Sequence, residues 1–170
     1  MRRSVLSVFL ILCFFAIYGC SGGGGGNSGA GIPVANNGLP PDPGEAGKAT
    51  LEGIDSDGDG VRDDVQRHIM LTYPDEPTRR ALVQLAKAEQ SFLISAHDKA
   101  KALNSASERS RAMECIFFVQ PDEAVEILRR MRAELLNTEL RIRASIAADS
   151  LLGGETFPSV SIEERSSSCR

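Results

Sequence analysis

Residues 77–103 read PTRRALVQLAKAEQSFLISAHDKAKAL and show the clearest periodicity of the chain. Apolar side chains recur three or four positions apart, a spacing that gathers them on one face of an α-helix. This apolar face consists of Leu82, Leu85, Phe92, Ala96 and Leu103. Because such a face must be buried against another element, the stretch predicts a helix over about residues 77–103 within a helical domain.

Three further segments carry helix signals. A helix is expected over residues 62–71, because prolines stop it shortly afterwards. A third helix is expected over residues 105–117, because it opens with the S-x-x-E pattern of a capping box. A long fourth helix is expected over residues 121–152, since proline suits its first turn and a glycine pair follows it. Its apolar stripe is Val125, Leu128, Met131, Leu135, Ile142 and Ile146.

The sequence therefore predicts an all-α fold, a small bundle of about four helices over residues 62–155. Residues 156–170 are expected to form an irregular C-terminal tail. We interpret the arginines of the expected fourth helix as a solvated face, with i,i+4 pairs from Glu126 to Arg130 and from Glu139 to Arg143. These arginines are Arg129, Arg130, Arg132, Arg141 and Arg143.

Residues 20–50 have the composition of a flexible linker. They include the glycine run at positions 22–26 and several further glycines and prolines. Such a segment cannot bury enough apolar surface to offset its ordering entropy. A flexible chain of this length reaches about 30 Å on average, so it would keep the domain close to its attachment point.

Residues 1–19 have the features of an export signal. Arg2 and Arg3 give a positive start, and residues 5–17 are almost wholly apolar. This apolar run is shorter than the roughly 20 residues of a transmembrane helix. We therefore expect an exported protein whose first nineteen residues are a signal peptide.

The end of this signal resembles the lipobox of bacterial lipoproteins. Ile17, Gly19 and Cys20 match its pattern, whereas Tyr18 stands where a small or aliphatic residue is usual. The resemblance implies cleavage before Cys20 and acylation of its sulfur and amino group, and several acyl chains give stable membrane anchoring. Ser21, and not Asp, follows the cysteine, which favours the outer membrane or cell surface over the inner membrane. An uncleaved anchor and a plain secretory signal are the alternatives.

The charge of the chain argues against binding to nucleic acid. Loss of the signal removes Arg2 and Arg3 from 19 basic residues and none of the 23 acidic residues, so the formal charge falls from −4 to −6. Contacts with phosphates need a basic face.

Residues 55–64 read DSDGDGVRDD and are the most informative stretch for function. Carboxylates packed this closely repel one another unless a cation lies between them. Calcium takes six to eight oxygen ligands at about 2.3–2.6 Å, and alternating aspartates on a curled loop converge on one point. Gly60 would supply the sharp turn of such a loop.

The D-x-D-x-D-G pattern resembles the EF-hand loop and the calcium loops of thrombospondin type 3 and dockerin domains. The ligands implied for Ca²⁺ are the side chains of Asp55, Asp57, Asp59 and Asp63 and the carbonyl of Val61. An EF-hand has Glu at its twelfth place, and this chain has Gln66 there, so either Asp63 or Asp64 supplies the missing oxygens or the site is weak. Residues 51–66 are thus expected as half an EF-hand, with a helix on the exit side. A solvated acidic turn that caps the first helix is the alternative.

Two cysteines remain once Cys13 leaves with the signal and Cys20 carries lipid. In an oxidising compartment Cys115 and Cys169 are expected to form a disulfide, which ties the tail to the third helix. A buried free thiol at Cys115 is the alternative.

Taken together, these features predict a membrane-tethered, non-enzymatic calcium-binding module whose partner is an envelope protein or the cell wall. Zincin, nucleophile-elbow and Walker motifs are absent from the sequence. One alternative is an envelope hydrolase that uses carboxylates such as Glu89, Glu114 and Glu134. Another is a periplasmic helper or inhibitor protein that docks through its helix stripes.

Overall fold

The structure is a computed structural model that describes residues 38–170, so the expected signal peptide, Cys20 and the linker up to residue 37 lie outside the described residues. Within that range the fold is helical, as predicted. Its elements are η2 (Gly44–Lys48), α1 (Asp63–Thr72), α2 (Glu76–Ile94), α3 (Lys99–Val119), α4 (Ala124–Leu135), α5 (Glu139–Ser150) and η3 (Ile162–Ser168), where η denotes a 3-10 helix. None of the described helices is long and apolar enough to cross a membrane.

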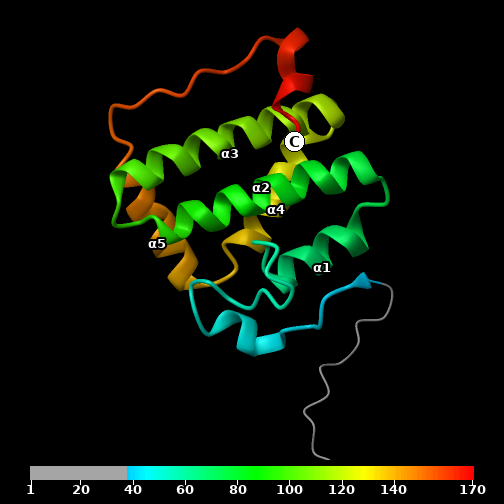
Figure 1. Cartoon of the computed structure of the whole chain (residues 1–170), viewed down its shortest axis with the longest axis vertical. Helices are drawn as coiled ribbons and strands as arrows, with labels where there is room; N and C mark the ends of the chain where they lie inside the picture. Colours follow the sequence, from blue (N-terminus) through cyan, green and yellow to red (C-terminus); the bar gives the residue numbers. More distant parts are fainter. Residues whose placement is uncertain (1–37) are drawn as a thin grey trace, which may run out of the picture. The chain divides into compact units, whose positions relative to one another are not determined.

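Helices α2 and α3 lie side by side and form the centre of the bundle (Figure 1). Leu82 and Phe92 of α2 and Ile116 of α3 are fully buried, as the apolar spacing of α2 predicted. Helices α1 and α4 pack around one part of this pair, and α5 packs on α2 and α3. The core is therefore built mostly from aliphatic side chains, whose burial contributes roughly 25 cal/mol per Å².

The helix predicted over residues 77–103 is in fact two helices. The hydroxyl of Ser95 donates to the carbonyl of Phe92 (2.7 Å) and closes α2. The side chain of Asp98 then accepts a hydrogen bond from the amide of Lys101 (3.1 Å) and caps α3. Ser105, which was expected to begin the third helix, is buried inside α3. The local caps thus override an apolar spacing that continues through the break.

The prediction of one long fourth helix is also wrong. Helix α4 ends at Leu135, and a separate helix, α5, begins at Glu139. The hydroxyl of Thr138 accepts from the amide of Arg141 (3.2 Å) and caps the new helix. This break changes the phase of the apolar stripe, so Ile142 and Ile146 are 45% and 64% exposed. Arg141, which was expected to face water, is fully buried instead.

The expected surface ion pairs of this region are present. Glu126 lies 2.7 Å from Arg130, and Glu139 lies 2.6 Å from Arg143. Both pairs are exposed and stabilise the fold only slightly.

The domain begins earlier than composition indicated. Residues 38–50 were assigned to the linker, but Gly47 is buried and its carbonyl accepts from Arg141 Nη2 (2.7 Å). The carbonyl of Pro40 accepts from Arg67 (2.7 Å). Buried guanidinium groups need oxygen acceptors, and this segment supplies them from its backbone.

The tail is more ordered than predicted, because η3 packs against α3 beside the C-terminus (Figure 1). Arg165 of η3 forms an ion pair with Glu114 of α3 (2.8 Å). Cys169 lies at disulfide distance from Cys115, with an S–S distance of 2.00 Å and a Cα–Cα distance of 4.9 Å. The cysteine pairing is the one that the sequence predicted.

Candidate metal centre

The acidic loop, which we define as residues 55–61 before α1, is curled by its own aspartate side chains. Oδ1 of Asp55 accepts from the amide of Gly58 (2.8 Å), and its Oδ2 accepts from the amide of Gly60 (2.8 Å). Oδ1 of Asp59 accepts from the amide of Val61 (2.7 Å). Gly58 and Gly60 have φ values of +70° and +89°, a left-handed conformation that glycine adopts without steric strain. The side chain of Val61 is buried in the core and fixes the end of the loop.

This curl brings three of the predicted ligands together. Each of Asp55, Asp57 and Asp59 offers a carboxylate oxygen, and these oxygens all lie within 4.8 Å of one another. The three side chains are exposed, and we call them the Asp triad. Lys87 lies 3.9 Å from Asp59, a long ion pair at the margin of the triad. Three carboxylates at this spacing repel one another, and the group could hold a metal ion that offsets this repulsion.

Gln66 contacts the triad from α1. Its Nε2 donates to Oδ2 of Asp57 (3.3 Å), and this hydrogen bond is the main reason why the pKa of Asp57 is lowered. The side-chain oxygen of Gln66 is buried and has no hydrogen-bond partner within the described residues. The residue that departs from the EF-hand pattern therefore lies beside the triad with a spare oxygen.

Asp63, also predicted as a ligand, is not among the carboxylates that converge in the triad, but it contacts the loop through Ser56. It is only 1% exposed, and its Oδ1 accepts from the amide (2.9 Å) and hydroxyl (3.1 Å) of Ser56. Its Oδ2 is buried and has no hydrogen-bond partner within residues 38–170. A buried carboxylate oxygen without a partner is strongly unfavourable, and a bound cation or water relieves it.

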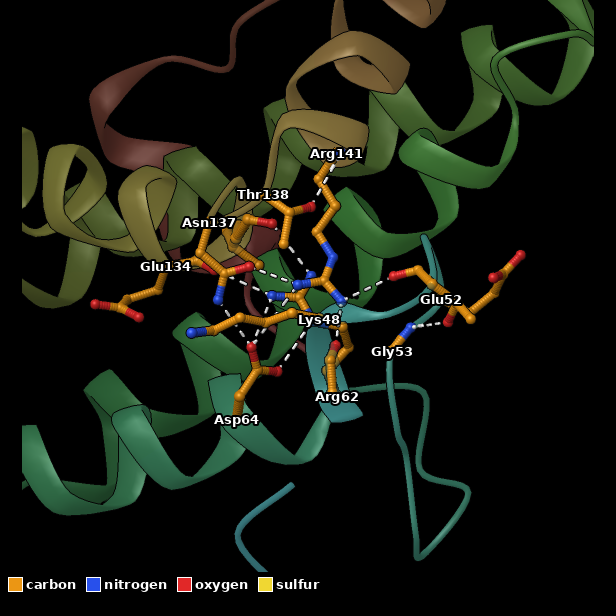
Figure 2. A network of polar contacts seen from close by, with 12 residues as sticks. Lys48, Glu52, Gly53, Arg62, Asp64, Glu134, Asn137, Thr138 and Arg141 are labelled. Carbon is orange, nitrogen blue, oxygen red and sulfur yellow. Dashed lines mark hydrogen bonds and ion pairs between the residues drawn. The ribbon is translucent and has the colours of Figure 1, made fainter. Parts of the chain in front are cut away.

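Asp64 is not brought to the triad. It points into the domain, where Arg62 donates to its two oxygens at 3.0 and 3.2 Å and Asn137 donates at 3.0 Å (Figure 2). Burial alone would raise the pKa of Asp64, but the hydrogen bonds and charge of Arg62 outweigh burial and lower it. The carboxylate of Asp64 is therefore neutralised by protein cations, which removes the need for a metal.

Two buried arginines hold both ends of the loop (Figure 2). Arg141 is 0% exposed and donates to the carbonyls of Gly47 (2.7 Å), Thr50 (3.2 Å) and Leu51 (3.2 Å), all before the loop. Arg62, directly after the loop, donates to the carbonyls of Glu134 (3.0 Å) and Leu135 (3.1 Å) at the end of α4. The arginines thus fix the chain on entry to the loop and on exit from it.

Gly53 is required by this arrangement. Its φ is +71°, and a Cβ atom there would lie 2.6 Å from Cδ of Arg62 and 2.8 Å from Nη2 of Arg141. The sequence pattern did not indicate that either arginine is buried. The available signal was Thr138, a favourable N-cap residue, because a helix that starts there puts Arg141, Ser145 and Ala148 on one face.

The three glutamates considered for hydrolysis do not form one group. Glu114 pairs with Arg165, and Glu134 lies 3.8 Å from Nδ1 of His68. Glu89 is buried beside Arg109 and lines a pocket different from the one that Glu114 lines.

No protein-family model, curated protein or solved structure matches this chain. What the loop can bind is therefore inferred only from its own side chains and those next to it. These groups are the exposed Asp triad and the buried oxygens of Asp63 and Gln66.

Proposed function

We propose that this chain is an exported envelope lipoprotein whose helical domain binds one calcium ion at the Asp triad. The domain would act as a non-enzymatic interaction or structural module. The observation that carries this proposal is the convergence of three exposed carboxylates, whose oxygens lie within 4.8 Å of one another. Asp63, which contacts Ser56 of the loop and has a buried oxygen without a hydrogen-bond partner among the described residues, is a further candidate ligand. Oxygen-only ligands with several negative charges suit a hard cation such as calcium.

The proposed ligands come from the loop and its exit. Side-chain oxygens of the Asp triad and Asp63 would bind the ion, together with the carbonyl of Val61 and water. Gln66 would add a neutral oxygen in place of the bidentate Glu of an EF-hand. Asp64 is left out of the ligand set, since Arg62 and Asn137 already occupy its oxygens. This set is weaker than a full EF-hand, and a dissociation constant of about 10⁻⁴–10⁻³ M is typical of extracellular calcium modules.

Calcium at this place would stiffen the connection between the N-terminal segment of the domain, which contains η2, and helix α1. Arg141 fixes the backbone before the loop and Arg62 fixes the backbone after it, so the loop is the free segment between two anchored points. Neutralising the triad would remove the repulsion within that segment. The ion would therefore act as a structural element that is filled wherever calcium is plentiful.

Hydrogen exchange tests this structural role. Calcium is expected to slow amide exchange at Gly58, Asp59 and Gly60, whose amides bond to triad carboxylates. Amides in the middle of α3 serve as the internal control, because they lie in a helix remote from the loop in sequence. Unchanged exchange in the loop at saturating calcium would contradict a structural ion.

The proposed anchor is the acylated Cys20, and the partner would be another envelope protein or the cell wall. The net negative charge of the chain supports a partner other than nucleic acid. The linker would let the domain search the space within roughly 30 Å of the membrane.

Export and lipidation can be tested on the full chain in a bacterial host. Wild-type protein is expected in the membrane fraction, with an N-terminal peptide that begins at Cys20 and carries acyl mass. Cys20→Ser should abolish that mass, whereas Cys13→Ser, a matched change inside the signal, should leave it intact. Wild-type protein that keeps its first nineteen residues, or that lacks acyl groups, would rule the anchor out.

A further inference from the structure

A pocket of about 230 Å³ lies among α2, α3 and α4, away from the acidic loop in sequence. This volume is below the roughly 300–1,000 Å³ of sites for drug-sized ligands, so it suits a smaller molecule. Its walls combine four apolar side chains with three charged ones. They are Leu85, Met113, Leu128 and Leu135, and Glu89, Arg109 and Arg132.

The charged pair inside this pocket is incompletely bonded. Glu89 is 5% exposed, and its Oε2 lies 3.6 Å from Nη1 of Arg109, which is too long for a hydrogen bond. Oε1 of Glu89 and Nη1 of Arg109 are both buried without a hydrogen-bond partner within the described residues. Burial raises the pKa of Glu89, and the charge of Arg109 opposes that rise. An acceptor and a donor therefore stand side by side, each lacking a partner.

Arg109 is held in place by other contacts. Its guanidinium carbon lies 4.1 Å from the centre of the Phe92 ring, and its Nη2 donates to Asp149 (3.3 Å). Nη1 is then the guanidinium nitrogen that lies 3.6 Å from Oε2 of Glu89 and has no hydrogen-bond partner within the described residues. The donor is thus preorganised, which lowers the entropic penalty of binding.

Arg132 adds a cation to the same pocket from α4. Its side chain is exposed, and it forms no ion pair among residues 38–170. The neighbouring Arg129 and Arg130, by contrast, both pair with Glu126 at 2.7 Å. Arg132 is therefore free to bind an anionic group at the pocket.

We propose that this pocket binds a small aliphatic zwitterion, an apolar α-amino acid being the simplest example. Its ammonium group would donate to Glu89, and its carboxylate would accept from Arg109 and Arg132. Its aliphatic side chain would pack against Leu85, Met113 and Leu128. A simple anion leaves Glu89 without a donor, and a simple amine meets two arginines, so the charge pattern favours a ligand with both groups.

Binding is tested by calorimetric titration of the purified full chain with L-leucine. Two matched probes each lack one charged group: 4-methylpentanoate has no ammonium and 3-methylbutylamine has no carboxylate. Leucine is expected to bind, and each probe about tenfold or more weakly, because one charge-assisted hydrogen-bond group is missing. Absence of leucine binding, or equal binding of all three, would overturn the proposal and leave water as the partner of Glu89 and Arg109.

Variants separate the pocket from its surroundings. Arg132→Ala changes an exposed side chain, so the fold should survive, while leucine affinity falls about tenfold and that of 3-methylbutylamine does not fall. Arg129→Ala, a matched change on the same helix outside the pocket lining, should bind leucine like wild type. Glu89→Gln should weaken both leucine and the amine. Leucine binding that is unchanged in Arg132→Ala would refute the assignment even if Glu89→Gln failed to fold, and EGTA should not alter any of these results.

Discussion

The five carboxylates of residues 55–64 fall into two groups that differ in their partners. The Asp triad is exposed, and its ion pair with Lys87 is long, at 3.9 Å. Asp64 lies inward, between the guanidinium groups of Arg62 and Arg141, at 3.0 and 4.0 Å. Carboxylates that are neighbours in sequence therefore obtain their cations from different sources. One group is neutralised by the protein, and the other could hold a cation from solution.

Asp63 stands between the two groups. It is buried like Asp64 but has no arginine partner, and one of its oxygens lacks any hydrogen-bond partner within the described residues. We assign it to the metal group because its bonded oxygen contacts Ser56, a residue of the loop. The following predictions test this division.

The largest loss of stability is expected from Arg141→Met, which removes one of the two arginines that neutralise Asp64. The change leaves the carbonyls of Gly47, Thr50 and Leu51 without their donor and the charge of Asp64 less compensated. Removal of one partner from a buried ionic network destabilises by about 3–5 kcal/mol. Urea unfolding measures this loss.

The matched control is Arg143→Met, two residues further along the same helix and on a different face. Arg143 is exposed and bonded only to Glu139 in its ion pair, so its loss should leave the urea midpoint close to wild type. Equal midpoints for the two variants would mean that Arg141 does not hold the loop.

Asp64→Asn should have the next largest effect. It weakens the charge-assisted hydrogen bonds from Arg62, and we expect a loss of about 2 kcal/mol with or without calcium. Asp57→Asn is the comparison, since it should be neutral or slightly stabilising in EGTA, where it relieves repulsion in the triad. If both variants lost a similar amount of stability in EGTA, the triad and Asp64 would not differ in how they are neutralised.

Asp63→Asn sharpens the boundary between the groups. The amide oxygen can still accept from Ser56, so stability in EGTA should change little. The calcium dissociation constant should rise about tenfold or more, because a charged ligand is replaced by a neutral one. Calcium titration of both proteins measures this, and an unchanged constant would remove Asp63 from the ligand set.

The smallest effect is expected in the acid dependence of stability. The pKa of Asp64 is lowered in the folded protein, so its stabilising contribution is present above its ordinary pKa of about 3.9 and is lost as pH falls through the folded value. The stability difference between wild type and Asp64→Asn should therefore shrink below about pH 4. Melting curves in EGTA between pH 6 and pH 3 measure this difference, and a constant difference would contradict the ionic role of Asp64.

The division between predictable and unpredictable features follows from the range of the interactions. Leu82, Leu85 and Phe92 revealed α2 because helical spacing is a local property of the sequence. The triad was also predictable, since side-chain-to-amide bonds over two to five residues curl the loop. The separation of Asp64 from the triad could not be predicted from the sequence, because its partners Asn137 and Arg141 lie more than 70 residues away along the chain.

The breaks in the helices were missed for a related reason. Apolar residues continue in phase through Ala96 and through Leu135, so the pattern gave no sign of an end. The caps at Asp98 and Thr138 were visible as residue types, yet their use depended on where α3 and α5 pack. The buried face of α5, which includes Arg141, became recognisable only with that break in place.

Calcium titration of the purified chain tests the central claim most directly, with melting curves in calcium and in EGTA. Wild type is expected to bind about one ion, with a dissociation constant of about 10⁻⁴–10⁻³ M. At calcium about a hundredfold above that constant the gain is about 2.7 kcal/mol, which raises the melting temperature on the order of 10 °C. Asp57→Ala and Asp59→Ala should lose both the heat and the shift. Absence of heat and of any shift in wild type at ten-millimolar calcium (about 10⁻² M, above the expected constant) would contradict the site and leave the acidic loop as a cap for α1.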